Sequence, residues 1–204
     1  MMLVMLHGWG FDRDFWRKLR EELNGFDCIS WDLGFYGDPH MPPPERPAIA
    51  VGHSYGLLWL LKHRPFAWRG LISINGFSRF SAAGDFPQGV PLAQLDRLSG
   101  ELAKSPAATV QAFRQRCGDQ DSMPVGIRAE PLQASLDHLR HWDQRGGKID
   151  LALCGERDKV VPPALSRACF DPETSIWHPG GHLLPLQDPA WCASHMRHFI
   201  EDRV

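Results

Sequence analysis

The sequence predicts an α/β fold in which helices flank an open, mostly parallel β-sheet. Short apolar runs alternate along the chain with longer segments of helical periodicity, an order typical of parallel sheets with crossover helices. The runs are brief and continuous rather than alternating, as expected of strands buried on both faces. We expect about six strands, at residues 3–6, 28–31, 49–51, 71–74, 151–154 and 175–177.

Three segments between and after these runs predict helices that pack on the sheet. Residues 12–23 carry aromatic and aliphatic side chains at the spacing of an amphipathic helix. Residues 54–63 are almost wholly apolar and end shortly before a proline, as expected of a central buried helix. Residues 189–203 begin with a proline, which suits the first turn of a C-terminal helix.

One long region interrupts the alternation of strands and helices. Residues 77–145 contain helical patterns, clearest at 92–103 and 107–117, but no convincing strand. An insertion at the carboxyl edge of a parallel sheet lies where ligands bind, so we expect a small helical lid over the site. Residues 41–47, by contrast, hold too many prolines for a helix and predict an extended loop. The length of 204 residues suits a single domain, 1–204.

Composition and charge argue against several classes of function. A net charge of −2 gives no basic excess for nucleic acid. No apolar stretch approaches the roughly 18 residues of a membrane span, and the start lacks the features of a signal peptide. The five cysteines show no C-x-x-C spacing and the histidines no H-E-x-x-H motif. We therefore expect a cytoplasmic protein with no metal, no cofactor, and no nucleic-acid or membrane partner.

The strongest chemical signal is the pentapeptide Gly52-His53-Ser54-Tyr55-Gly56. It lies between a predicted strand and a predicted helix, and G-x-S-x-G in that context is the nucleophile elbow of a serine hydrolase. The glycines permit a sharp turn between closely packed backbones, and the free N–H groups of the helix start favour negative charge. We therefore predict Ser54 as a nucleophile.

A second signal is the L-H-G-W-G sequence at residues 6–10, directly after the first predicted strand. Glycines there let the backbone approach a substrate. The backbone N–H groups of Trp9 and of Tyr55, which follows the nucleophile, are therefore the predicted donors to an oxyanion. Alone, the segment would suit a plain strand-to-helix turn, but the elbow favours the oxyanion role.

Two loops after later strands supply a base and an acid. The P-G-G-H sequence after the last strand predicts His182 as the base. The G-E-R-D sequence after the fifth strand offers Asp158, which can accept a hydrogen bond from the histidine and hold its tautomer. Glu156 is the alternative acid, and we favour Asp158. The chain order Ser54, Asp158, His182 is that of α/β-hydrolases.

With these segments in place, the chain resembles the α/β-hydrolase superfamily over essentially its whole length. Within it, the chain is most similar to the pimeloyl-[acyl-carrier-protein] methyl ester esterases of biotin synthesis. This likeness rests on the start at residues 6–16 and on the lid segments 80–87, 110–113 and 139–145. The resemblance implies a compact α/β-hydrolase fold and a serine esterase without a cofactor, acting on the methyl ester of pimeloyl-[acyl-carrier protein].

The resemblance also assigns roles to individual residues. The family's nucleophile, acid and base fall on Ser54, Asp158 and His182. Its oxyanion and substrate-contact positions fall on Trp9 and Tyr55. The lid segment that lines the family's acyl site falls on Phe113, Arg114, Gln115, Arg116 and Cys117.

The chain departs from the family in its charge and in two local features. The proline loop at 41–47 stands where a helix normally precedes the elbow strand, and Tyr55 where an aliphatic residue is common. Family members meet an acidic carrier protein with a basic lid, whereas residues 77–147 hold equal numbers of basic and acidic side chains. Three lid arginines could ring the mouth of the acyl site or form ordinary surface ion pairs: Arg114, Arg116 and Arg128.

Two other functions therefore stay open. One is a general carboxylesterase or thioesterase for small acyl esters, with no carrier protein. The other is a non-hydrolytic member of the superfamily that binds a small ligand, against which the intact set of Ser54, Asp158 and His182 argues.

Overall fold

The computed structural model describes residues 1–121 and 124–201. Within them, six strands form one sheet of order β2-β1-β3-β4-β5-β6, and each neighbouring pair is parallel. Every predicted run forms a strand, so the predicted α/β class is confirmed. The strands are β1 (Met2–Leu6), β2 (Asp27–Trp31), β3 (Ala48–His53), β4 (Trp68–Ile74), β5 (Leu151–Gly155) and β6 (Ser175–His178).

Side chains of the central strands alternate between two separate cores, because successive residues of a strand point to opposite faces. In β1, Leu3 and Met5 join a core that includes residues of α1 and α8. Val4 and Leu6 join a second core, built with residues of α2. Burial on both faces explains why these strands read as continuous apolar runs in the sequence.

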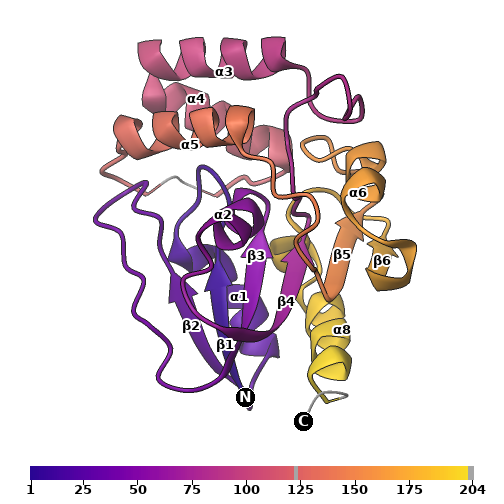
Figure 1. Ribbon diagram of the computed structural model, residues 1–204. Coiled ribbons are helices and arrows are strands. Elements are labelled where there is room, and N and C mark those ends of the chain that lie inside the picture. Colours follow the sequence, from indigo (N-terminus) through magenta and orange to yellow (C-terminus); the bar gives the residue numbers. More distant parts are fainter. Residues whose placement is uncertain (122–123, 202–204) are drawn as a thin grey trace.

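The two faces of the sheet are covered by helices (Figure 1). Helix α2 (Tyr55–His63) lies on one face, and α1 (Arg17–Glu22) packs beside α8 (Pro189–Glu201) on the other. The helix predicted at 12–23 is split into a 3₁₀ turn, η1 (Arg13–Trp16), followed by α1. The turn starts at Asp12, whose carboxylate accepts the N–H of Asp14 at 2.9 Å. The predicted end of the C-terminal helix, at residue 203, lies outside the described residues.

Between β4 and β5 the chain leaves the sheet and forms α3 (Leu92–Lys104), α4 (Pro106–Cys117) and α5 (Ala129–His141). These helices gather beyond the carboxyl ends of the strands (Figure 1). The sequence had indicated the first two but not α5. Its buried Leu132, Leu136 and Leu139 are spaced i, i+4, i+7, and that pattern would have identified it.

The remaining elements connect β5, β6 and α8. They are α6 (Pro163–Cys169), the 3₁₀ turn η2 (Pro172–Thr174) and the short α7 (Leu184–Gln187). The proline-rich segment 41–47 contains neither helix nor strand, as predicted. In the described part of the chain, no helix has the length and apolar character needed to cross a membrane.

Candidate active site

Ser54 lies at the turn between β3 and α2, in a backbone conformation that L-residues rarely adopt. Its φ is 53° and its ψ is −125°. Such a conformation costs on the order of 1–3 kcal/mol and persists only where the surroundings enforce it. Here a Cβ on Gly52 would lie 2.5 Å from the Cα of Leu57, and one on Gly56 would lie 2.3 Å from the backbone oxygen of Leu6. Both glycines of the motif are therefore required for the elbow to pack.

The three residues predicted as nucleophile, base and acid lie in one chain of hydrogen bonds. The Oγ of Ser54 is 3.1 Å from Nε2 of His182, and Nδ1 of His182 is 2.7 Å from Oδ2 of Asp158. The residues come from three different strand ends, those of β3, β5 and β6. All are buried, with 5% of Ser54, 2% of His182 and 5% of Asp158 exposed. The arrangement can move a proton from the serine to a histidine whose charge a carboxylate balances.

The geometry separates Asp158 from its alternative, Glu156. The side chain of Glu156 is exposed, while the carboxylate of Asp158 is enclosed and fully hydrogen-bonded. Its Oδ1 accepts the backbone N–H groups of Val160 and Val161 at 2.8 and 2.9 Å. Its Oδ2 accepts from His182 and from the side-chain amide of Asn75 at 2.7 Å. Four donors thus hold the carboxylate that faces the histidine.

Asn75, which the sequence did not single out, stands at the end of β4. Its amide nitrogen also donates to the backbone oxygen of Gly181 at 3.2 Å, so it joins the acid to the loop that carries His182. Its φ of 49° is a left-handed conformation that asparagine tolerates better than most residues. A polar residue at a strand end of a parallel sheet is the only signal that could have identified it.

The loop that carries Trp9 lies directly against Ser54. A Cβ on Gly8 would be 2.9 Å from the Cβ of Ser54, so this loop passes too close to the serine for a side chain at residue 8. The indole of Trp9 is buried and donates to the backbone oxygen of Leu132 in α5 at 3.0 Å. Tyr55, which follows Ser54 in the sequence, is the first residue of α2. The oxyanion role of the two backbone N–H groups stays a prediction.

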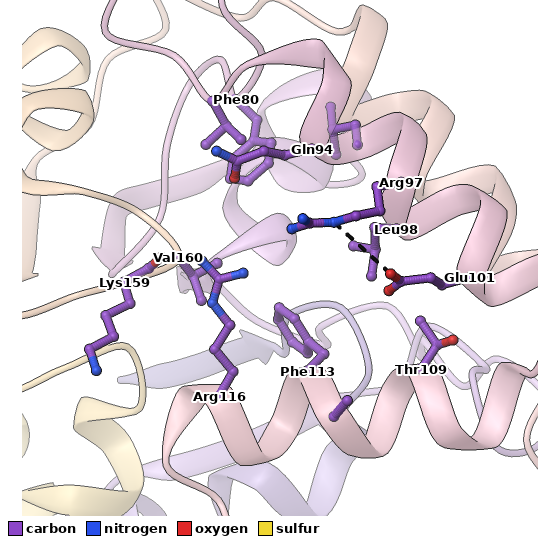
Figure 2. Close-up of a pocket in the computed structure, with 13 residues that line it drawn as sticks. Phe80, Gln94, Arg97, Leu98, Glu101, Thr109, Phe113, Arg116, Lys159 and Val160 are labelled. Atoms are coloured by element: carbon purple, nitrogen blue, oxygen red, sulfur yellow. Dashed lines mark hydrogen bonds and ion pairs between the residues drawn. The ribbon is translucent and has the colours of Figure 1, made fainter.

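A cavity of about 170 Å³ lies between α3 and α4 (Figure 2). Its walls carry apolar side chains and its rim carries charged ones. Lys159 and Val160, which line it, directly follow Asp158. Phe113 points into the cavity and also packs edge-on against Trp9, with 4.9 Å between ring centroids. Phe113 thus joins the cavity to Trp9, whose neighbour in sequence, Gly8, lies against Ser54. The apolar lining is Phe80, Val90, Leu95, Leu98, Phe113 and Val160.

Only part of the predicted lid segment lines this cavity. Phe113 and Arg116 line it. Gln115 is exposed to solvent and does not line the cavity, and Cys117 belongs to the core that includes residues of β1, α1 and α8. Arg114 is buried and pairs with Asp119 at 2.6 Å, so it too is turned away from the cavity. Consecutive residues of a helix point in different directions, so five in a row cannot face one site.

The three lid arginines do not form one basic patch. Arg114 is paired with Asp119, but the pair is buried, so it neither lies at the cavity mouth nor forms an ordinary surface ion pair. Arg128 donates to the backbone oxygen of Gly37 at 2.7 Å and lies away from the cavity lining. Arg116 alone of the three reaches the cavity rim, where the other cations are Arg97 and Lys159.

Comparison with curated proteins confirms the resemblance to pimeloyl-[acyl-carrier protein] methyl ester esterases. The chain is 26% identical to that enzyme of Xylella fastidiosa (strain M23) over an alignment of 241 residues, covering 97% of this chain and 94% of the relative. It is 26% identical to that of Neisseria meningitidis serogroup C over 198 residues, covering 80% and 77%. No protein-family model matches the chain.

Solved structures establish the fold independently. An esterase from Exiguobacterium antarcticum superposes with a TM-score of 0.82 at 18% identity, covering 98% of this chain and 92% of that one. BioG from Haemophilus influenzae superposes with a TM-score of 0.66 at 17% identity, covering 94% and 93%. The chain therefore has the α/β-hydrolase fold.

Proposed function

We propose that this carboxylic ester hydrolase removes the methyl group from the methyl ester of pimeloyl-[acyl-carrier protein] in biotin synthesis, with Ser54 as its nucleophile. The observation that carries the proposal is the buried chain of hydrogen bonds from Ser54 through His182 to Asp158. The similarity to esterases of that name supports the choice of substrate.

The reaction follows from the positions of these groups. Ser54 Oγ attacks the ester carbonyl and passes its proton to Nε2 of His182, whose positive charge Asp158 balances. The N–H groups of Trp9 and Tyr55 hold the oxyanion, each contributing roughly 3–4 kcal/mol in comparable sites. Methanol leaves with the proton from His182 and an acyl-enzyme remains. Water, deprotonated by His182, then attacks the acyl-enzyme, and the free acid is released as Ser54 regains its proton.

The cavity between α3 and α4 suits the acyl chain and the arm that joins it to a carrier. Its walls are apolar, as a methylene chain requires, and it adjoins the loop of Asp158. Neither Ser54 nor His182 lines it, since Phe113 and Trp9 lie on the path between.

The rim of the cavity supports contact with an acidic carrier protein. Arg116 and Lys159 stand at one end of it (Figure 2), and neither has a carboxylate partner among the ion pairs of the described residues. Arg97 is paired with Glu101 across 4.0 Å. Unneutralised cations attract an acidic partner over a distance and speed its encounter, an effect that weakens as salt rises.

The test is hydrolysis of pimeloyl methyl ester, free and carrier-linked, by the wild type and by Ser54→Ala. Ester hydrolysis that persists in Ser54→Ala would refute the nucleophile. We expect Arg116→Glu combined with Lys159→Glu to lower kcat/KM much more for the carrier-linked ester than for the free ester. Arg128→Glu is the matched control, because it reverses a lid charge away from the cavity.

A second candidate is a general carboxylesterase for small acyl esters. The balanced charge of the lid and the modest size of the cavity favour it. Equal kcat/KM for free and carrier-linked esters, with the same salt dependence, would select this candidate.

A further inference from the structure

His53, the residue before Ser54, has no part in the reaction as proposed, yet it is completely buried beside the base. Its Nε2 is 2.9 Å from the backbone oxygen of His182, and the two imidazole centroids are 4.9 Å apart. The ring packs against Phe15 at 4.4 Å. The rings of Phe11 and Trp16 approach edge-on at 6.3 Å.

The protonation state of His53 follows from these contacts. A carbonyl oxygen only accepts hydrogen bonds, so Nε2 carries the proton and donates it. Nδ1 then holds a lone pair and has no hydrogen-bond partner within the described chain. Burial lowers the pKa of His53 well below its ordinary value, and the nearby His182 acts in the same direction. The ring is therefore neutral and places no charge beside the base.

The loop of His182 is held by individual hydrogen bonds, among them Arg157 N–H to the backbone oxygen of Gly180 at 3.0 Å and Gly181 N–H to Oε1 of Gln187 at 3.2 Å. His182 lies between β6 and α7 in a segment without helix or strand, so no regular backbone ladder fixes it. Both ring nitrogens are engaged by Ser54 and Asp158, which leaves the main chain to be held separately. Asn75 holds the preceding carbonyl, that of Gly181, and His53 holds the carbonyl of His182 itself.

We infer that His53 is a positioning residue, which ties the main chain of the base to the strand end that carries the nucleophile. His53 and Ser54 are adjacent at the end of β3, so one contacts the backbone of His182 while the other contacts its side chain. Because His53 and Ser54 are consecutive, these two contacts together fix the distance between Ser54 Oγ and His182 Nε2. The inference rests on the proposed role of Ser54 and His182.

Three substitutions separate positioning from packing. In His53→Gln the side-chain amide nitrogen falls near the place of Nε2 and can donate to the same carbonyl. His53→Met keeps the bulk but loses the donor, and His53→Asn keeps an amide that is one methylene too short to reach. Phe15→Leu loosens the packing around the ring and leaves the hydrogen bond in place, so it is the control for general damage.

The experiment measures kcat and KM on a short soluble p-nitrophenyl ester, with melting temperatures for every variant. We expect His53→Met and His53→Asn to lower kcat by about 10- to 100-fold with little change in KM, because misplacing a catalytic group by about 1 Å can cost about 10²-fold. We expect His53→Gln to keep kcat within a few-fold and Phe15→Leu to lose stability but not kcat. If His53→Met does not fold, the difference in kcat between His53→Gln and His53→Asn tests the positioning role.

A second readout needs no turnover and so separates this inference from the proposed function. The Nδ1 proton shared by His182 and Asp158 is followed by proton NMR as a downfield resonance. We expect the resonance to persist in wild type and in His53→Gln and to be lost or broadened in His53→Asn. Wild-type kcat and an unchanged resonance in both His53→Met and His53→Asn would overturn the inference, as would a His53→Gln variant as impaired as His53→Asn.

Discussion

The carboxyl edge of the sheet and the helical region above it are built in different ways. At the edge, each side chain of the candidate site follows the end of a strand within three residues: Ser54 after β3, Asn75 after β4 and Asp158 after β5. All are buried and joined by hydrogen bonds to their neighbours. Helices α3 and α4 instead enclose a cavity. The difference teaches that the hydrogen-bonded side chains are held at the ends of the strands, whereas the cavity is formed mainly by helices that lie beyond them.

The side-chain pairs of the two regions also differ. Arg97 and Glu101 of α3 are 4.0 Å apart and more than half exposed, and exposed pairs of this kind contribute little to stability. Arg114 of α4, by contrast, forms a buried ion pair with Asp119 at 2.6 Å. At the sheet edge, His182 and Asp158 are 2.7 Å apart and nearly inaccessible to water. Because the proposed reaction passes through this last pair, we expect changes at the sheet edge to lower the rate far more than changes on the exposed surface of the helices.

The largest effect should come from the acid at the sheet edge. Asp158→Asn should lower kcat by up to about 10⁴, because an amide permits the wrong tautomer of the histidine and cannot balance its charge. Glu156→Gln should change kcat little, since that side chain is exposed. Steady-state kinetics with circular dichroism to verify folding measures both. The opposite ranking of the two variants would assign the acid to Glu156.

A smaller effect is expected from the helical region. Phe113→Ala removes a side chain that lines the cavity and packs against Trp9. Partial loss of a phenyl contact is worth about 1.5 kcal/mol, so KM for a long-chain ester should rise about tenfold. The kcat for a short ester should stay near that of the wild type. A large loss of kcat on short esters would show that α4 takes part in the chemistry.

The smallest effect concerns stability and pH. Burial lowers the pKa of His53, so below its unfolded pKa of about 6.5 the unfolded chain binds a proton that the folded chain does not. The free energy of unfolding should therefore fall as pH falls below that value, by up to about 1.4 kcal/mol per pH unit from this residue. Urea denaturation of the wild type and His53→Gln between pH 7.5 and 5.5 measures it. Equal slopes for the two proteins would show that His53 accepts a proton while folded.

The sequence located the sheet edge better than the helical region for a physical reason. Buried parallel strands leave continuous apolar runs, and their carboxyl ends meet at one edge, so motifs after separate runs could be placed together. Ser54, Asp158 and His182 were predicted in this way, and the structure brings them together. The directions of Arg114 and Cys117 were not, because they depend on the rotation of α4 about its axis. Asn75 was missed because a single amide forms no motif.

Labelling with a fluorophosphonate probe, followed by peptide mapping, tests most directly whether Ser54 is the nucleophile of the buried hydrogen-bonded chain. We predict one adduct per molecule, located on Ser54, with no adduct in Ser54→Ala and much slower labelling in His182→Ala. An adduct on another residue of the wild type, or labelling of Ser54→Ala at the wild-type rate, would contradict the assignment.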